Sequence, residues 1–355
     1  MLTYPFRIAR TVTVGVSYPL SPAVIAPNVL PDPRNLIGRY GSIAVFDPNL
    51  KLPYTLGWSV AVQQSLGNDQ SLTVTYVGNS GRRLLQQLEK NITAINPRFS
   101  IIGLTTNNAT SSYNALQAQF QRRLSRGFQI LASYAWSHAL DFDSNNSGRF
   151  VPAYGNSFYD VRHNFSAALT YDIPVRTRYS VVNAIFGGWS VDSSFLARTG
   201  LPLDLIARQV TDSNGNLTAV RPNVIAGQPL YIYDSAFPGG RAINRAAFSI
   251  PATGQFGNLG RNVVRGFGMF EQNLGLRREF KIGETVRLQL KGEAFNIYNH
   301  PNFGEVQVTL PAANFGQATG LLNQSLATGG SAGRTSSLYT PGGPRSLQFA
   351  IRLSF

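Results

Sequence analysis

The residues best equipped for chemistry are the histidines and the acidic side chains near them. The chain has three histidines, and two of them stand among aspartates, in the order His138, Asp141, Asp143, Asp160 and His163, with His300 apart. No two histidines have the spacing of metal ligands. We therefore predict no metal site, and we expect hydrogen-bonding roles for these histidines near strand ends.

A second candidate site is the segment Asp141–Gly148, which begins like a calcium-binding loop with oxygen ligands at alternate positions. The calcium loop needs glycine at its sixth position and glutamate at its twelfth. Here Asn146 and Pro152 stand at those positions. The segment is therefore a poor match, and loop calcium stays an open alternative.

Other catalytic and cofactor patterns fail in the same way. The chain has no cysteine, which excludes a thiolate nucleophile and thiolate metal sites. Gly266 and Gly268 lack the third glycine of a dinucleotide fingerprint, and neither a phosphate-binding P-loop nor a GxSxG elbow occurs. We predict no catalytic residue, no cofactor and no enzyme.

The formal net charge is +14, but the basic residues form nothing longer than pairs such as Arg122-Arg123 and Arg277-Arg278. Nucleic-acid binding needs a basic face that neutralises several phosphates. The scattered arginines predict no nucleic-acid partner, and in loops they could meet anionic lipid headgroups.

Composition indicates an all-β chain with few charges. Of the 355 residues, 43% are hydrophobic and 14% are charged, against about 25% charged in a typical soluble protein. Glycine (34) and proline (20) are frequent, as expected for many strands and irregular loops. No apolar run approaches the ~20 residues of a membrane-spanning helix, so a membrane form must be a closed barrel.

Period-two alternation recurs about ten times along the chain. In 128–136, Phe128, Ile130, Ala132, Tyr134 and Trp136 share one face. The opposite faces carry Gln, Ser, Thr and Asn with few charges, which is typical of a water-filled lumen wall behind a lipid-facing surface.

The alternation slips after Gly292, which suggests a bulge. Near it, Lys291, Glu293 and either Arg277 or Arg278 predict a cross-strand ladder of charges that fixes register.

The predicted connections alternate between short and long. Short ones fall at 67–70, 125–127, 172–187 and 281–284, and long ones at 19–53, 78–112, 141–162, 200–268 and 299–345. Outer-membrane barrels have short periplasmic turns and long outer loops. We therefore predict the bacterial outer membrane as the location, with lipid as a partner.

Aromatic residues agree with this orientation. A belt is expected at the outer strand ends from Tyr54, Trp58, Tyr134, Trp136 and Tyr298, and at the inner ends from Tyr171 and Trp189. The last strand places Leu347, Phe349, Ile351, Leu353 and Phe355 on one face and ends the chain on an aromatic. This pattern is typical of the signal that the barrel-assembly machinery recognises.

Several motifs also carry a family resemblance. They are Asp47–Tyr54 with Trp58, Tyr76–Arg82, Ser112–Gln117, Tyr134–His138, Asp160–Phe165, Phe256–Arg261 with Arg265-Gly266, and Glu293–Gly304. In this order they resemble the C-terminal barrel of Oar-like TonB-dependent transporters. The resemblance implies a 22-stranded barrel with an N-terminal plug, a TonB-binding box and TonB-energised uptake of an unknown ligand.

We therefore expect residues 1–355 to be the C-terminal part of such a barrel, about ten strands of an antiparallel transmembrane β-barrel, with the signal peptide and plug domain absent. Two alternatives stay open. One is a small self-closing porin-like or structural barrel, and the other is a soluble β-sandwich binding module.

Overall fold

The chain is described by a computed structural model that covers residues 40–97, 99–142, 144, 153–175, 178–211, 217–283, 285–323 and 341–355. It is almost entirely β-structure and comprises two compact units. No helix among the described residues is long and apolar enough to cross a membrane.

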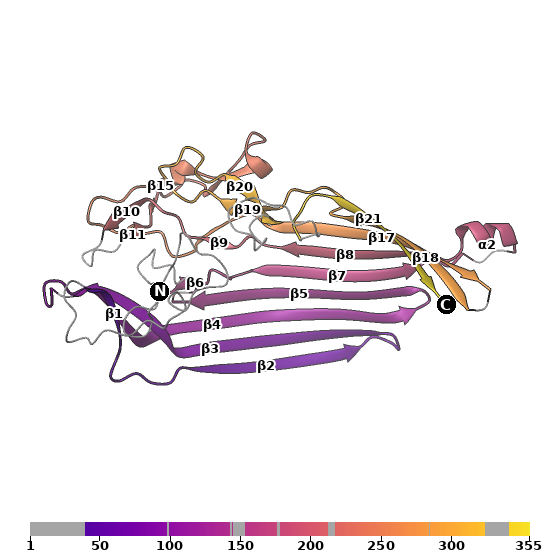
Figure 1. The fold of residues 1–355 in the computed structure, drawn as a ribbon, viewed down its shortest axis with the longest axis horizontal. Coiled ribbons are helices and arrows are strands. Elements are labelled where there is room, and N and C mark those ends of the chain that lie inside the picture. The colour runs from indigo at the N-terminus through magenta and orange to yellow at the C-terminus, as the bar shows by residue number, and fades with distance from the viewer. Residues whose placement is uncertain are drawn as a thin grey trace, which may run out of the picture. The chain divides into compact units, whose positions relative to one another are not determined.

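The larger unit comprises residues 56–80, 111–209 and 219–355. Its framework is a path of hydrogen-bonded strands in the order β2-β3-β4-β5-β7-β8-β17-β18-β21 (Figure 1). The bounds are Tyr54–Ser65 for β2, Gln70–Asn91 for β3, Phe99–Ser125 for β4, Phe128–Asp141 for β5, His163–Asp172 for β7, Trp189–Arg198 for β8, Met269–Ile282 for β17, Val286–Phe295 for β18 and Ser346–Ser354 for β21.

Every strand pair from β4 to β21 whose register is described is antiparallel. The fold class predicted from alternation, an antiparallel barrel portion of about ten strands, is confirmed. Among the described residues β2 and β21 do not pair with each other, so the path stays open. The region around Val12, expected at an edge, lies outside the described residues.

Short turns join the strands at one end, as predicted. The β4–β5 turn is the tightest, and Arg126 and Gly127 both have positive φ, at 52° and 78°. Two consecutive positive φ angles give the turn the backbone twist of a hairpin. Phe355 lies at this same end, because Ser354 pairs with Arg287 beside the β17–β18 turn. The longest of these connections carries the helix α2 (Ser180–Phe186).

The predicted long loop at 78–112 was wrong, because most of it belongs to strands. β3 has 22 residues and β4 has 27, whereas a membrane-crossing strand needs about 9–11. The residues in this segment are rich in Asn, Thr and Ser, which suggested a loop. The hydrogen bonds between β3 and β4 join backbone groups, and polar side chains do not prevent them.

The smaller unit comprises residues 1–55, 81–110 and 210–218. In it β1 (Tyr40–Phe46) pairs in parallel with β4, from Tyr40 opposite Phe99 to Phe46 opposite Thr105. The segment 47–53 then leads from β1 towards β2. Asn107 holds this segment, because its Oδ1 accepts from Lys51 N at 2.5 Å and its Nδ2 donates to Lys51 O at 2.7 Å. The same amide donates to Arg83 O at 2.8 Å.

At the end opposite the short turns, the long connections form a folded layer, which we call the loop layer (residues 200–209, 219–268 and 299–323). It contains short strands and two 3₁₀ turns: β9 (Pro202–Leu203), β12 (Asn223–Val224), β13 (Tyr231–Tyr233), η1 (Pro238–Gly240), β14 (Arg241–Ile243), η2 (Arg245–Ala247), β15 (Phe248–Ser249), β16 (Val264–Arg265), β19 (Phe303–Val306) and β20 (Ala318–Leu321). Two further short strands, β10 (Arg208–Thr211) and β11 (Leu217–Val220), pair with each other. A further short strand, β6 (Gly155–Asn156), pairs with the end of β5.

The loop layer has a hydrophobic core of its own. The buried residues are Leu205, Ala207, Ile243, Ala247, Phe248, Leu259, Val264, Leu310 and Phe315. Backbone hydrogen bonds join the two connections, from Leu310 N to Ile206 O at 2.8 Å and from Ile243 N to Gly316 O at 3.0 Å. Gly316 has φ +79°, and a Cβ there would lie 2.3 Å from Ile243 O, so this close approach requires glycine.

Candidate functional site

The two faces of the sheet differ sharply in chemistry. Cross-strand register places Gln119, Ser133 and Ser166 in one row on one face. The adjacent row on the other face contains Ala118, Tyr134 and Phe165. The sorting follows from period two, because neighbouring residues of a strand point to opposite sides. We call the first surface the polar face and the second the apolar face.

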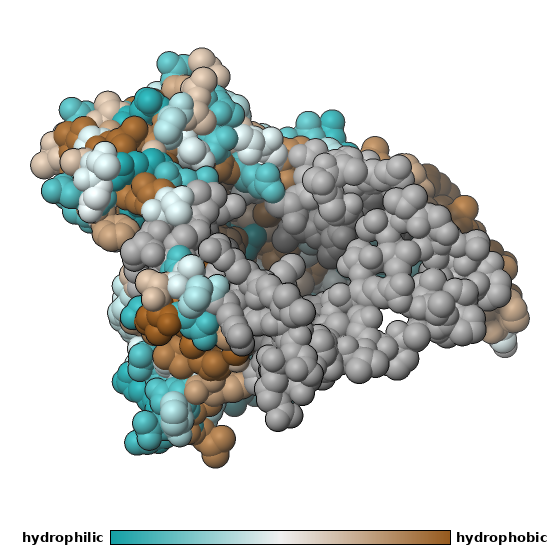
Figure 2. Space-filling view, turned by 60° about the vertical axis from the view of Figure 1, so that its left-hand side comes forward, coloured by the Kyte–Doolittle hydropathy of each residue, from teal (hydrophilic) through white to brown (hydrophobic). Residues whose placement is uncertain are grey.

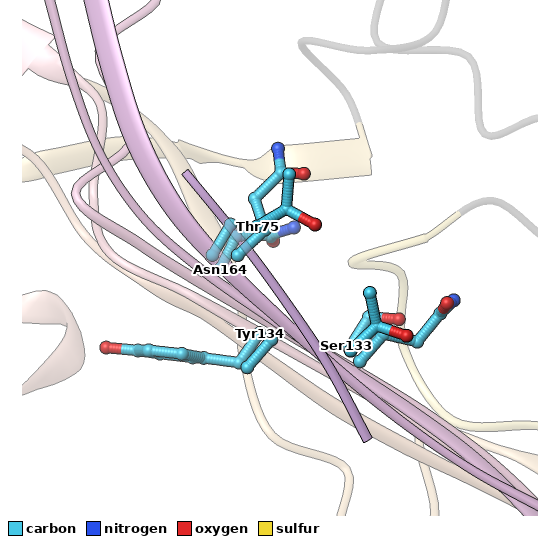
Figure 3. A pocket seen from close by; sticks show the side chains of 9 residues that line it. Thr75, Ser133, Tyr134 and Asn164 are labelled. Carbon is cyan, nitrogen blue, oxygen red and sulfur yellow. The ribbon is translucent and has the colours of Figure 1, made fainter. Parts of the chain in front are cut away.

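A hollow of about 320 Å³ lies on the polar face. Thr73 and Thr75 of β3 contribute to it, and the other lining residues are Gln117, Ala118, Gln119, Ser133, Tyr134, Ala135 and Asn164. In Figure 3 the side chains of Thr75, Ser133 and Asn164 lie on the side away from the Tyr134 ring, which points in the opposite direction. The wall of the hollow therefore offers hydroxyls and amides without a formal charge.

A second hollow, of about 270 Å³, lies further along the sheet where β7, β8, β17 and β18 run side by side. Asp192 and Glu293 contribute carboxylates to its lining, and Asn273 contributes an amide. The polar face thus becomes more charged from β4 towards β18.

A ladder of charges continues from this hollow towards the short turns. Arg277 lies between two carboxylates, 3.4 Å from Asp172 and 3.2 Å from Asp192. Lys291 and Glu293 form a pair at 2.8 Å. The expectation is met only in part. Arg277 forms cross-strand ion pairs, but with Asp172 and Asp192, whereas Lys291 and Glu293 pair within β18. Arg278 lies on the apolar face opposite Trp189.

The bulge expected after Gly292 does not occur in the described ladder. The β17–β18 pairing runs without a register shift from Ile282 opposite Val286 to Leu274 opposite Ala294. β18 ends at Phe295, and Asn296 takes a positive φ of 47° that ends the strand. The change of parity therefore marks a strand end, which the alternation alone could not distinguish from a bulge.

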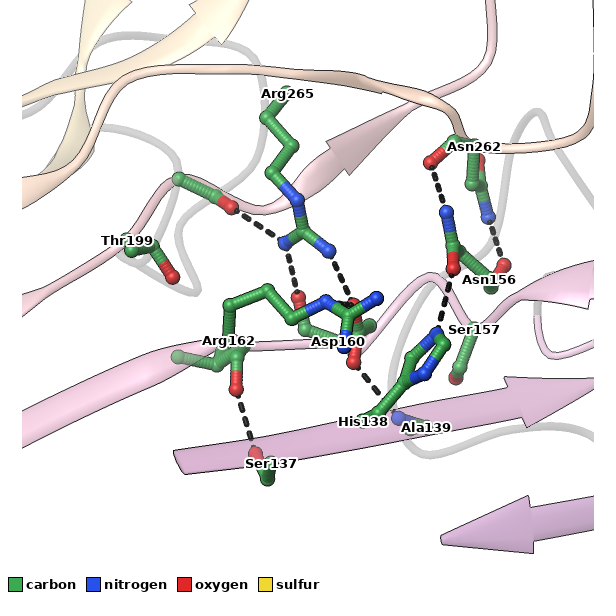
Figure 4. A network of polar contacts seen from close by, with 12 residues as sticks. Ser137, His138, Ala139, Asn156, Ser157, Asp160, Arg162, Thr199, Asn262 and Arg265 are labelled. Carbon is green, nitrogen blue, oxygen red and sulfur yellow. Dashed lines mark hydrogen bonds and ion pairs between the residues drawn. The ribbon is translucent and has the colours of Figure 1, made fainter. Parts of the chain in front are cut away.

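At the long-loop end, buried ion pairs attach the loop layer to the strands (Figure 4). Asp160 is fully buried, and its carboxylate accepts from Ala139 N at 2.7 Å and pairs with Arg265 and with Arg162. Arg261 pairs with Asp141 at 2.7 Å. These contacts link residues more than 100 positions apart in the sequence.

Reciprocal amide contacts extend the same network. Asn156 Nδ2 donates to Asn262 O at 3.0 Å, and Asn262 Nδ2 donates to Asn156 O at 2.8 Å. His138 Nε2 lies 2.9 Å from Asn156 Oδ1. Sequence reasoning did not identify this network, although Asp160, Arg261 and Arg265 all lie in the motifs that carried the family resemblance.

Two of the three histidines, His138 and His163, have the side-chain hydrogen bonds that the sequence predicted. Besides His138, His163 Nδ1 lies 2.7 Å from the Tyr134 hydroxyl. The ring of His300 packs edge-on against Phe270, with centroids 5.5 Å apart. Among the described residues no group of three His, Cys, Asp or Glu side chains could hold a metal ion. Asp143 and most of the calcium-like segment lie outside the described residues.

Three of the expected belt aromatics lie at strand ends, with Tyr54 first in β2, Tyr171 next to last in β7 and Trp189 first in β8. Trp58 lies within β2, Tyr134 and Trp136 lie within β5, and Tyr298 follows the end of β18. In β5, Phe128 and Trp136 are eight residues apart, about 26 Å along an extended strand, against an apolar band about 25 Å tall. Six belt members are 38–63% exposed, namely Tyr54, Trp58, Tyr134, Trp136, Tyr171 and Tyr298, and Trp189 is partly buried. Their contact with lipid stays a prediction.

The C-terminal strand presents its apolar row to solvent. Leu347, Phe349, Ile351 and Leu353 are 57–81% exposed, and Phe355 is 97% exposed. Recognition of this row during assembly also stays a prediction.

The outer surface of the loop layer mixes both kinds of residue. Figure 2, with the long-loop end turned forward, shows hydrophilic and hydrophobic residues interspersed over the loops. Exposed members include Tyr233 (76%) and Phe256 (67%). Such a surface offers both apolar contact and hydrogen bonds to a ligand.

Comparison with known proteins gives one family match and several distant structural ones. The family model described as "Outer membrane beta barrel domain" matches residues 2–336. No curated protein matches the chain. The crystal structure of the outer membrane transporter YddB from Escherichia coli matches with a TM-score of 0.48 at 10% identity, covering 89% of this chain and 34% of YddB.

Structures of P. aeruginosa FpvA bound to heterologous pyoverdines match with a TM-score of 0.42 at 9% identity, over 86% of this chain and 27% of FpvA. The FpvAI–pyocin S2 complex matches with a TM-score of 0.43 at 9% identity, over the same shares. The chain spans about a third of the length of these proteins or less.

Proposed function

The chain belongs to the outer membrane β-barrel domain family and is a protein of the bacterial outer membrane, and on this premise we propose that it forms part of the wall of a TonB-dependent transporter. In this function the polar face lines the path of an unknown ligand, and the loop layer captures that ligand at the outer surface. The ligand passes through the complete protein, energised through TonB.

The observation that carries the proposal is the sorting of the sheet into a polar and an apolar face, with opposite kinds of connection at its two ends. Water and lipid impose this arrangement on a barrel wall. The hollows at Ser133 and at Asp192 supply hydrogen-bonding groups along the polar face. The family is one of barrels and not of enzymes, so we infer that the chain is not catalytic.

The first experiment determines the length of the natural product. Outer membranes are digested and analysed by mass spectrometry, and the DNA upstream of Met1 is sequenced. The proposal expects peptides from a preceding plug and from further strands, since the path from β2 to β21 is open within the described residues. A product that begins at Met1 and gives a steady ion conductance in planar bilayers would instead support the small self-closing barrel.

The second experiment tests energy coupling. A deletion strain and its complemented parent are compared for uptake of radiolabelled iron–siderophore complexes, oligosaccharides and peptides. Uptake that depends on the gene is then measured with a proton uncoupler. The proposal expects the uncoupler to stop uptake, because TonB draws on the inner-membrane proton gradient, and uptake that continues at the same rate would contradict it.

A further inference from the structure

Two arginines lie on the apolar face near the short-turn end, where aliphatic and aromatic residues otherwise dominate. Arg122 of β4 pairs with Ile130, and Arg278 of β17 pairs with Leu290 and Trp189. An arginine on the lipid face costs about 2–4 kcal/mol at the bilayer midplane but about 0–1 kcal/mol near an interface. Their position therefore fits the interface and not the hydrocarbon interior.

Each of these arginines is stacked on aromatic rings. The Arg278 guanidinium carbon lies 4.3 Å from the Phe280 ring centroid and 5.2 Å from that of Trp189. The Arg122 guanidinium carbon lies 5.2 Å from the Phe128 ring centroid. Stacking covers the apolar faces of a guanidinium, whose five N–H donors point outwards in its own plane and can bind more than one acceptor. Arg122 Nη2 donates to Ser125 O at 3.5 Å.

The helix α2 lies beyond the strand ends at the same end of the sheet (Figure 1). It exposes apolar side chains, with Val181 at 67%, Ile185 at 53% and Phe186 at 58%. Trp189 Nε1 donates to Ile185 O at 3.2 Å, which fixes the helix to the start of β8. Just before the helix, the Arg178 guanidinium carbon lies 4.9 Å from the Tyr179 ring centroid.

We propose that Arg122, Arg178 and Arg278, with their aromatic partners and α2, form a binding site for anionic phospholipid headgroups of the inner leaflet of the outer membrane. The apolar side chains of α2 enter the acyl boundary, and the guanidinium groups bind lipid phosphate. Lipid is the occupant because Arg278 shares the apolar face with the exposed side chains of Leu276 and Leu290, and α2 exposes further apolar side chains at the same end. The inner leaflet follows from the periplasmic orientation of the short turns.

The test uses the fluorescence of Trp189. The chain has three tryptophans, and Trp58 and Trp136 lie towards the long-loop ends of their strands. The complete protein carries W58F and W136F, with phenylalanine in place of any tryptophan outside these 355 residues, and is reconstituted in phosphatidylcholine vesicles. A brominated phosphatidylglycerol or a brominated phosphatidylcholine is then added at equal mole fraction, and its quenching of Trp189 is measured.

We expect phosphatidylglycerol to associate about fivefold more strongly per arginine than phosphatidylcholine, since one basic residue near an anionic surface contributes about 1 kcal/mol. The preference should fall to the fivefold contribution of Arg178 in R122Q/R278Q and disappear in R122Q/R178Q/R278Q. It should persist in R287Q/R352Q, which removes two arginines from the polar face at the same end. Equal quenching by the two lipids, or loss of the preference in both R122Q/R178Q/R278Q and R287Q/R352Q, would overturn the proposal.

A second measurement guards against poor folding of the tryptophan background. In native mass spectrometry, the protein with all its tryptophans, released from mixed micelles, should retain phosphatidylglycerol, and the R122Q/R178Q/R278Q variant should not. Gel mobility before and after heating shows whether each variant has formed its barrel. Folded parent protein that retains no phosphatidylglycerol would refute the site.

Discussion

Replacing Asp160 by alanine should release the loop layer from the strands. Asp160 is fully buried, and its carboxylate contacts Arg265, Arg162 Nε at 3.3 Å and Ala139 N at 2.7 Å. Removing one partner of a buried ion pair costs about 3–5 kcal/mol, because the other charge stays buried without compensation. We expect local opening of the segment 256–268 to become easier by about 3 kcal/mol, roughly a hundredfold in its opening equilibrium.

Hydrogen exchange of peptides that cover 256–268 measures this opening directly. The matched control is E279A, which breaks the exposed pair with Arg287 and should change exchange by less than about 1 kcal/mol. The double variant D160A/R265M should recover part of the loss, because it removes the more buried of the two arginines that pair with Asp160 and leaves only Arg162 without that carboxylate. If D160A exchanges at the parental rate, or if E279A loosens the same segment equally, the ion pair does not hold the loop layer.

The absence of cysteine allows single introduced cysteines to report exposure without background. S133C on the polar face should react with a membrane-impermeant maleimide in lipid vesicles at least tenfold faster than F165C on the apolar face. Equal reaction rates would refute the assignment of the two faces. Removing the terminal aromatic in F355S should lower the amount of protein assembled in the outer membrane severalfold, while S354A should not, as measured by heat-modifiable mobility in membrane fractions. N107A should raise the rate of hydrogen exchange in the segment 47–53 by a factor that corresponds to about 1–3 kcal/mol, because Asn107 makes two hydrogen bonds with Lys51. An unchanged exchange rate would show that the pairing of β1 alone holds the segment.

The strand faces and the short turns could be predicted from the sequence because each depends on local information. Period two decides which side of a strand a residue occupies, and glycine with polar neighbours marks a hairpin such as the one at Gly127. These signals need no knowledge of distant residues. The register between β17 and β18 then decided between Arg277 and Arg278, which alternation had left open, and placed Arg277 on the face of Lys291.

The loop layer could not be predicted in this way. Its strands have two to four residues, too few to show a period, and its core joins Leu205 to Phe315 across more than 100 positions. The same holds for the pair between Asp160 and Arg265. These two residues are 105 positions apart, so their pairing produces no spacing pattern in the sequence. Only their contact in the structure connects the two motifs to which they belong.

Arg277 and Arg278 show why position decides the role of a charge in this chain. The two are adjacent and identical in type, yet Arg277 lies between Asp172 and Asp192 on the polar face, and Arg278 stacks on Trp189 and Phe280 on the apolar face. Water reaches the first, which carboxylates hold in place, whereas the second, in our proposal, meets lipid phosphate at the membrane surface. Exchanging an arginine with an adjacent uncharged residue of such a strand would move the positive charge from one face of the sheet to the other. The net charge of +14 therefore includes at least two kinds of arginine, one paired with carboxylates on the polar face and one stacked on aromatic rings on the apolar face.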